Sequence, residues 1–124
     1  MATFDDARHF ALSFPETAWD GDSRLSVAGK AFCWSWLERV DPKKARVPNS
    51  DVLVVSVASE EVKFGLAEAE PEKYFTEPHY DGYRAVMVRL PAVTDAELRD
   101  LIADAWQLRA PRAVLKRFEA EQPR

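Results

Sequence analysis

The stretch 71–112 constrains the fold most, because three of its features must fit one another at one edge of a domain. A loop over residues 77–83 precedes a strand-like run from Arg84 to Leu90. Thr94 and Glu97 then form a capping box, which predicts that a long helix starts at this point. The apolar stripe expected on this helix consists of Leu98, Leu101, Ile102, Ala105 and Leu108, with Trp106 at its flank.

The first half of the chain divides into short segments with clear signals. Thr3 and Asp6 resemble a capping box and predict a first helix over residues 3–14. Alternating apolar residues and two turn signals between Trp19 and Trp36 predict a three-stranded antiparallel meander. Residues 51–58 are apolar on both faces of a strand, which is typical of a strand in the interior of a sheet.

Three further segments complete the expected order of elements. Segment 38–50 contains Pro42 and Pro48 and shows no hydrophobic period, so we expect an exposed loop. Ser59 predicts the cap of a short helix that Pro71 ends, and Pro111 begins a last, basic helix. The order α-β-β-β-β-α-β-α-α predicts an α+β fold with an antiparallel sheet of about five strands, covered by helices on one face.

Length and composition define the class of protein. The 124 residues, 47% of them hydrophobic, suit a single domain, 1–124, that buries one core. The single cysteine, Cys33, excludes an internal disulfide framework and a zinc site built on cysteines, and is typical of a reducing cytoplasm. Asp5 and Asp6 stand where a secretory signal would be basic, and no apolar run approaches the roughly 20 residues of a membrane span. We expect a cytoplasmic monomer that does not contact membranes.

The charges are unevenly distributed. The net charge of −4 opposes sequence-independent binding to nucleic acid, which depends on Lys and Arg that neutralise phosphates. Residues 60–81 are strongly acidic, whereas segment 38–46 carries Arg39, Lys43, Lys44 and Arg46 against two acids. This basic loop is the best candidate for contacts to phosphates. A solvated loop that keeps the protein in solution explains the same charges.

Two aromatic clusters are candidates for ligand binding. Phe32, Trp34 and Trp36 alternate along one strand, where they form either a platform for a base or an apolar ligand, or part of the core. His79 with Tyr83 belongs to the one cluster suited to acid–base chemistry, although a turn at Asp81-Gly82 explains the same residues and is the favoured interpretation. No nucleophile–base pair, metal-ligand spacing or phosphate loop stands out in the sequence. We therefore expect no catalytic residues, no metal site and no cofactor.

Four short motifs, in order along the chain, resemble the MmcQ/YjbR family. They are residues 11–17 at the end of the first helix, 27–32 at the second hairpin, 80–83 before the last strand, and 98–111. The resemblance implies a CyaY-like, frataxin-like α+β fold. It also implies DNA binding, because family members are commonly described as DNA-binding proteins whose hairpin loops form a double wing.

Two functions follow as competing hypotheses. The leading one is a small non-enzymatic protein that binds DNA weakly and salt-dependently through its wing loops. Its candidate residues are Lys30, Arg39, Lys43, Lys44, Arg46 and Arg84. The alternative is a protein- or small-ligand-binding module without nucleic acid, with candidate residues Trp34, Trp36, His79, Tyr80 and Tyr83. Exposed tryptophans would favour the alternative, and buried ones would favour the basic loop.

Overall fold

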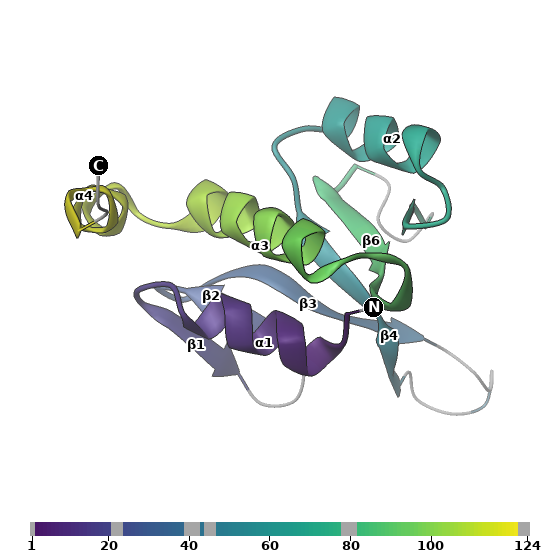
Figure 1. Cartoon of the computed structure of the whole chain (residues 1–124), viewed down its shortest axis with the longest axis horizontal. Coiled ribbons are helices and arrows are strands. Elements are labelled where there is room, and N and C mark those ends of the chain that lie inside the picture. Colours follow the sequence, from purple (N-terminus) through teal and green to yellow (C-terminus); the bar gives the residue numbers. More distant parts are fainter. Residues whose placement is uncertain (1, 21–23, 39–42, 44–46, 78–81, 122–124) are drawn as a thin grey trace.

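The computed structural model describes residues 2–20, 24–38, 43, 47–77 and 82–121. It is an α+β fold in which helices lie on one side of a single antiparallel sheet (Figure 1). The strands are β1 (Thr17–Asp20), β2 (Arg24–Val27), β3 (Lys30–Glu38), β4 (Val47–Ser56), β5 (Tyr74–Phe75) and β6 (Ala85–Arg89). The helices are α1 (Phe4–Leu12), α2 (Glu60–Ala69), the 3-10 helix η2 (Leu90–Ala92), α3 (Asp95–Arg109) and α4 (Arg112–Glu121).

The sheet has six strands in the order β1-β2-β3-β4-β6-β5, and every neighbouring pair is antiparallel. β4 lies between β3 and β6, and its residues 52–56 are buried, which confirms the interior strand expected at 51–58. The three-stranded meander is confirmed as β1, β2 and β3. β5 was missed in the sequence because two residues are too few to show a period-two pattern.

The core lies between the sheet and the helices. α1 and α3 lie side by side in front of the sheet in Figure 1 and bury Ala7, Leu98 and Ile102 against Leu53 and Val55 of β4. α2 packs against β5 and β6 at the other end of the sheet. The prediction of helices on one face is therefore confirmed for the described part of the chain.

Local capping signals identified the helix starts correctly. The Thr3–Asp6 and Thr94–Glu97 capping boxes both form, with each hydroxyl accepting from the backbone N–H three residues on and each carboxylate accepting from the cap N–H. The Ser59 hydroxyl accepts from the Val62 N–H at the start of α2. These contacts satisfy N–H groups that a helix leaves unpaired at its first turn.

The buried face of α3 differs from the predicted stripe. Leu108 is 48% exposed, whereas Trp106, expected at the flank, is completely buried. Trp106 stacks on Phe14 at 5.2 Å between ring centroids, lies 4.9 Å from the Phe118 ring, and donates from Nε1 to the Pro15 carbonyl at 3.1 Å. Contacts with the end of α1 and with α4 thus rotate the buried face toward Trp106. Helical periodicity alone cannot reveal these partners, because they are distant in the sequence.

The strand boundaries also differ from those expected. Segment 38–50 is not a loop throughout, because Glu38 ends β3 and Val47 begins β4. Pro48 has no backbone N–H to donate to a neighbouring strand. It is tolerated in β4 because only β3, among the described strands, pairs with β4 at this point, so no strand on the other side of β4 needs a hydrogen bond from it. The last strand covers Ala85–Arg89 rather than the expected run from Arg84 to Leu90, and Pro91 lies in the 3-10 helix that follows Arg89.

Candidate functional site

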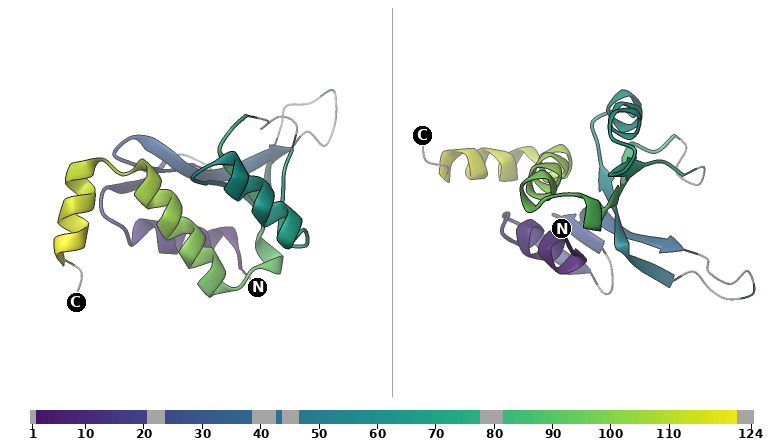
Figure 2. Two further views of the ribbon diagram at one scale, coloured as in Figure 1. Left: turned by 90° about the horizontal axis from the view of Figure 1, so that it is seen from above. Right: turned by 45° about the vertical axis from the view of Figure 1, so that its right-hand side comes forward.

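The β3–β4 hairpin extends beyond the rest of the sheet. β2 pairs with β3 as far as Trp34, and β6 pairs with β4 from Val52 onward. Between these limits and the turn, Trp36, Leu37 and Glu38 pair with Asn49, Pro48 and Val47. These six residues, called here the β3–β4 ribbon, have no other strand beside them in the described part of the sheet. Figures 1 and 2 show the ribbon projecting away from the helices.

The turn of this hairpin contains most of the basic residues proposed to contact nucleic acid. Lys43 is exposed at the turn. Arg39, Lys44 and Arg46 lie outside the described residues, as do four positions between them. In the sequence, all four basic residues and one acid, Asp41, fall within the eight positions 39–46 that join the two strands of the ribbon.

Lys30 and Arg84, the other two candidates, lie at the opposite end of the sheet. Lys30 begins β3 after a tight turn in which Ala28 and Gly29 both have positive φ, 48° and 84°. The Arg84 carbonyl accepts from the N–H of Val57, which directly follows the end of β4. Since β3 and β4 are antiparallel, the start of β3 and the end of β4 share one end, and the ribbon is at the other. The structure therefore separates the candidate set into two groups.

The face of the sheet opposite the helices carries an aromatic cluster. Trp34, Trp36 and Phe75 are half-buried and pack over Val54 and Met87, which are completely buried. No helix side chain belongs to this cluster in the described chain. The Trp36 and Phe75 rings are 5.8 Å apart in an edge-to-face arrangement. The aromatic face, as we call these three rings with Arg89, thus combines core packing with partial access to solvent.

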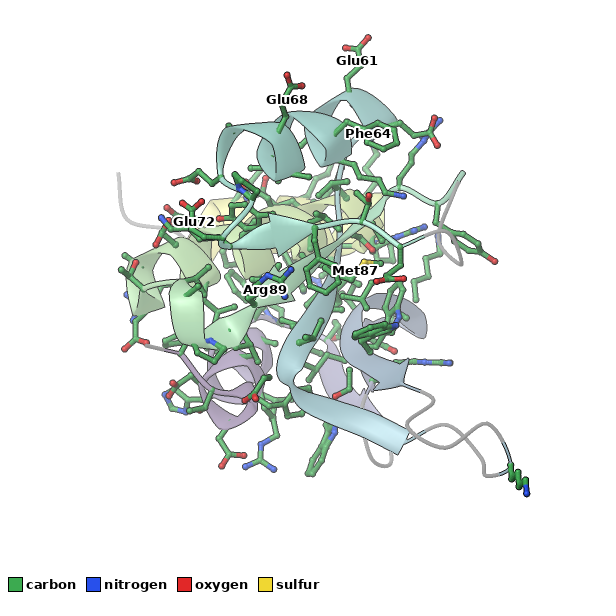
Figure 3. The ribbon with its side chains drawn as sticks, turned by 90° about the vertical axis from the view of Figure 1, so that its right-hand side faces the viewer. Glu61, Phe64, Glu68, Glu72, Met87 and Arg89 are labelled. Carbon is green, nitrogen blue, oxygen red and sulfur yellow. The ribbon has the colours of Figure 1, made fainter. Side chains whose placement is uncertain are left out.

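Arg89 extends the aromatic face toward the edge of the sheet. Its guanidinium lies 4.1 Å from the Phe75 ring centroid, which is a cation–π contact. Met87 and Arg89, which lie two positions apart on β6, are labelled in Figure 3. Sequence reasoning missed Arg89 and Phe75, because β5 was not recognised and the side of the last strand that faces the tryptophans was not assigned. The Met-x-Arg spacing of Met87 and Arg89 was a usable signal only after β6 had been placed beside β4.

Phe32, Trp34 and Trp36 were expected on one face of a strand, and this prediction is wrong for Phe32. Phe32 is completely buried in the core under the helices, whereas both tryptophans lie on the other face. Leu25 pairs with Cys33 and Ser26 with Ala31, so β3 has one extra residue, Phe32, at this point. Such a β-bulge breaks the alternation of faces. The core therefore gains a large side chain beside the small residues of β3.

The remaining candidates that the structure describes show no catalytic arrangement. Tyr83 is 60% exposed, while His79 and Tyr80 lie outside the described residues. Cys33 is completely buried, and burial raises its thiol pKa, so it is a small core residue rather than a reactive thiol. His9 is exposed on α1. Within the described ranges, no three His, Cys, Asp or Glu side chains come close enough to hold a metal ion.

One ion-pair cluster has a structural role. Lys73 Nζ donates to Glu97 at 2.7 Å and to Glu70 at 3.0 Å. These hydrogen bonds raise the pKa of Lys73, and the bond from Lys73 lowers the pKa of Glu97. Glu97 also belongs to the capping box of α3. The cluster thus ties the segment before β5 to the start of α3.

An α+β protein with a projecting basic hairpin and an aromatic sheet face is the class that these features define. Comparison with known families is more specific. The YjbR family model matches residues 12–108, and the chain belongs to this family. This confirms the resemblance to the MmcQ/YjbR family.

Relatives from mycobacteria match nearly the whole chain. One is Uncharacterized protein Rv2570 of Mycobacterium tuberculosis (strain ATCC 25618 / H37Rv), and another is Uncharacterized protein Mb2600 of Mycobacterium bovis. Each is 36% identical over 126 residues, which cover 97% of this chain and 98% of the relative. No solved structure matches the chain significantly. In the described part of the chain, all helices are too short or too polar to cross a bilayer.

Proposed function

We propose that this YjbR-family protein binds DNA through the β3–β4 ribbon and its basic turn. The observation that supports the proposal is the ribbon itself: residues 36–38 and 47–49 pair with each other and with no other described strand. A two-stranded ribbon of this kind is narrow enough to enter the major groove of B-DNA. Four basic residues between its strands supply the contacts to phosphates.

The affinity expected from this arrangement is modest and depends strongly on salt. Each phosphate neutralised by a basic side chain contributes about 0.9 to the slope of log K against log salt concentration. The net charge of −4 opposes approach to DNA over the rest of the surface. Binding therefore requires the ribbon to be held away from the acidic residues of 60–77. Figure 1 shows the ribbon at the end of the sheet, on the opposite side from α2.

Fluorescence anisotropy with a labelled duplex, repeated over a range of salt concentrations, tests the proposal. Replacing Lys43, Lys44 and Arg46 together by Ala should weaken binding about equally for unrelated sequences and reduce the salt slope by up to about 2.7. The matched control replaces Lys30 and Arg84, at the opposite end of the sheet, and should leave the slope nearly unchanged. An unchanged slope in the triple variant, or a larger loss in the control, would reject the ribbon as the binding element.

The aromatic face favours a second candidate function, binding of a protein or small ligand without nucleic acid. Trp34 and Trp36 are half-buried, which is neither the full exposure that would favour ligand binding nor the full burial that would favour the basic loop. The cation–π pair of Arg89 and Phe75 offers a ligand both charge and an apolar surface. Replacing Trp34 and Trp36 by Phe keeps apolar packing while changing the exposed edge. If the aromatic face is the binding surface, the variant with Phe at positions 34 and 36 loses affinity for a partner. The variant with Ala in place of Lys43, Lys44 and Arg46 keeps that affinity.

The proposed role is non-enzymatic in both cases. Screening the purified protein against general esterase, phosphatase and nuclease substrates tests this directly. The one sequence cluster suited to acid–base work contains His79. Turnover that is lost in His79→Ala would refute the non-enzymatic proposal and locate the reaction near the turn before β6.

A further inference from the structure

A groove between α2 and α3, called here the α2–α3 groove, lies on the helical side of the sheet. Its volume is about 530 Å³, which is within the range of pockets that bind small molecules. Figure 2 shows the two helices side by side when the molecule is seen from above. The groove is separate from both the ribbon and the aromatic face, so a ligand site in the groove does not depend on the proposed DNA binding.

The walls of the groove are aliphatic. Leu66 of α2 and Leu101 of α3 are half-buried and both line it. Val62 and Leu108 complete the two walls and are 43% and 48% exposed. Partly exposed aliphatic side chains that converge on one hollow leave apolar area in contact with water. A ligand with an apolar body would remove that area from water, which is the main source of affinity in such pockets.

The polar groups of the groove select the charge of the ligand. Asp104 and Gln107 of α3 line it, and no lysine or arginine is among its described lining residues. Glu61 and Glu68 point outward from the neighbouring surface of α2 in Figure 3. The Asp104 carboxylate at the groove, together with these two more distant carboxylates, attracts cations and repels anions. A carboxylate beside an aliphatic wall is suited to an ammonium group attached to a short hydrocarbon.

We propose that the α2–α3 groove binds a small organic cation with an aliphatic body, such as a primary alkylamine. The hydrocarbon lies against Leu66, Leu101 and Leu108, and the ammonium group pairs with the Asp104 carboxylate. Gln107 offers an amide oxygen as a further acceptor. The site requires no change of the fold, because its walls are already in place between two helices.

Titration of the full chain with n-hexylamine, n-hexanol and hexanoate, followed by ¹H–¹⁵N NMR, tests the site. The three probes share their hydrocarbon and differ in charge at pH 7. We expect saturable shifts of the Val62, Leu66 and Leu108 amides, with hexylamine binding about 2- to 5-fold more tightly than hexanol, as for a partly exposed ion pair. Hexanoate should bind most weakly. No saturable shift at these amides with hexylamine, or equal affinity for all three probes, would overturn the proposal.

A charge reversal gives the sharpest check. Asp104→Lys should invert the ranking so that hexanoate binds more tightly than hexylamine. Asp100→Lys changes the net charge equally from an exposed position on the same helix that does not line the groove, and should keep the original ranking. The same ranking in Asp104→Lys as in the unchanged protein would refute the role of this carboxylate.

A second pair of variants tests the hydrocarbon part of the site. Ala58→Leu places a larger side chain at the edge of the groove and should weaken all three probes together. Ala69→Leu makes the same change at an exposed position of α2 outside the groove and should leave them unaffected. Equal effects of the two substitutions would show that the probes bind elsewhere.

Discussion

Truncation of Ile102 tests the packing of α3 on the sheet. The side chain is completely buried in the core under the helices. Ile102→Ala removes three carbon atoms, each contributing about 0.8 kcal/mol of transfer free energy, or about 2.4 kcal/mol together. The cavity left behind adds to this, whereas the better helix propensity of Ala recovers about 0.4 kcal/mol. We expect a loss of about 3 kcal/mol in the free energy of unfolding.

Leu108 and Asp104 on the same helix provide matched controls. Leu108 is 48% exposed, so Leu108→Ala loses about half the transfer term, near 1 kcal/mol, and leaves no closed cavity. Asp104→Ala changes an exposed residue and should stay within about 0.5 kcal/mol. Urea unfolding followed by tryptophan fluorescence gives all three values, provided that the denaturant slopes agree. A loss at Leu108 equal to that at Ile102 would show that the helix presents a different face.

Two other substitutions act on stability through local structure. Ala28→Asn should raise the free energy of unfolding by about 0.5–1 kcal/mol, because Ala28 and Gly29 form a turn with positive φ at both positions, where Asn-Gly is preferred; a lower thermal midpoint would contradict this. Glu97→Gln should flatten the acid limb of a stability–pH curve. The Lys73 ammonium lowers the pKa of Glu97 in the folded state, so its contribution is complete above pH 4.5, the ordinary pKa, and is lost as pH falls through the folded value. Parallel acid limbs for the two proteins would refute that assignment.

Features determined by neighbouring residues were predictable from the sequence. The capping boxes at Thr3 and Thr94 depend on side chains three positions apart, and both helices begin as expected. The apolar run at 51–58 identified the central strand, because a strand buried on both faces has no polar alternation. The basic residues of segment 38–46 were also visible, since charge is a property of the sequence itself.

Features determined by distant contacts were not predictable. Trp106 is buried because Phe14 and Phe118 lie against its ring, and these residues come from the segment after α1 and from α4. The bulge at Phe32 depends on how β2 pairs with β3, which no single strand reveals. The candidate site shows the same limit: Lys30 and the basic turn are close in sequence but lie at opposite ends of β3.

Mapping the residues that contact DNA is the most direct test of the central proposal. Titration of ¹⁵N-labelled protein with a short duplex at low salt should shift the amides of Trp36, Leu37 and Asn49 in the β3–β4 ribbon, together with the Trp36 indole. The amides of Lys30 and Arg84 at the other end of the sheet should stay in place. Shifts confined to Lys30 and Arg84, or an absence of any saturable shift in the ribbon, would contradict the proposal that the β3–β4 ribbon binds DNA.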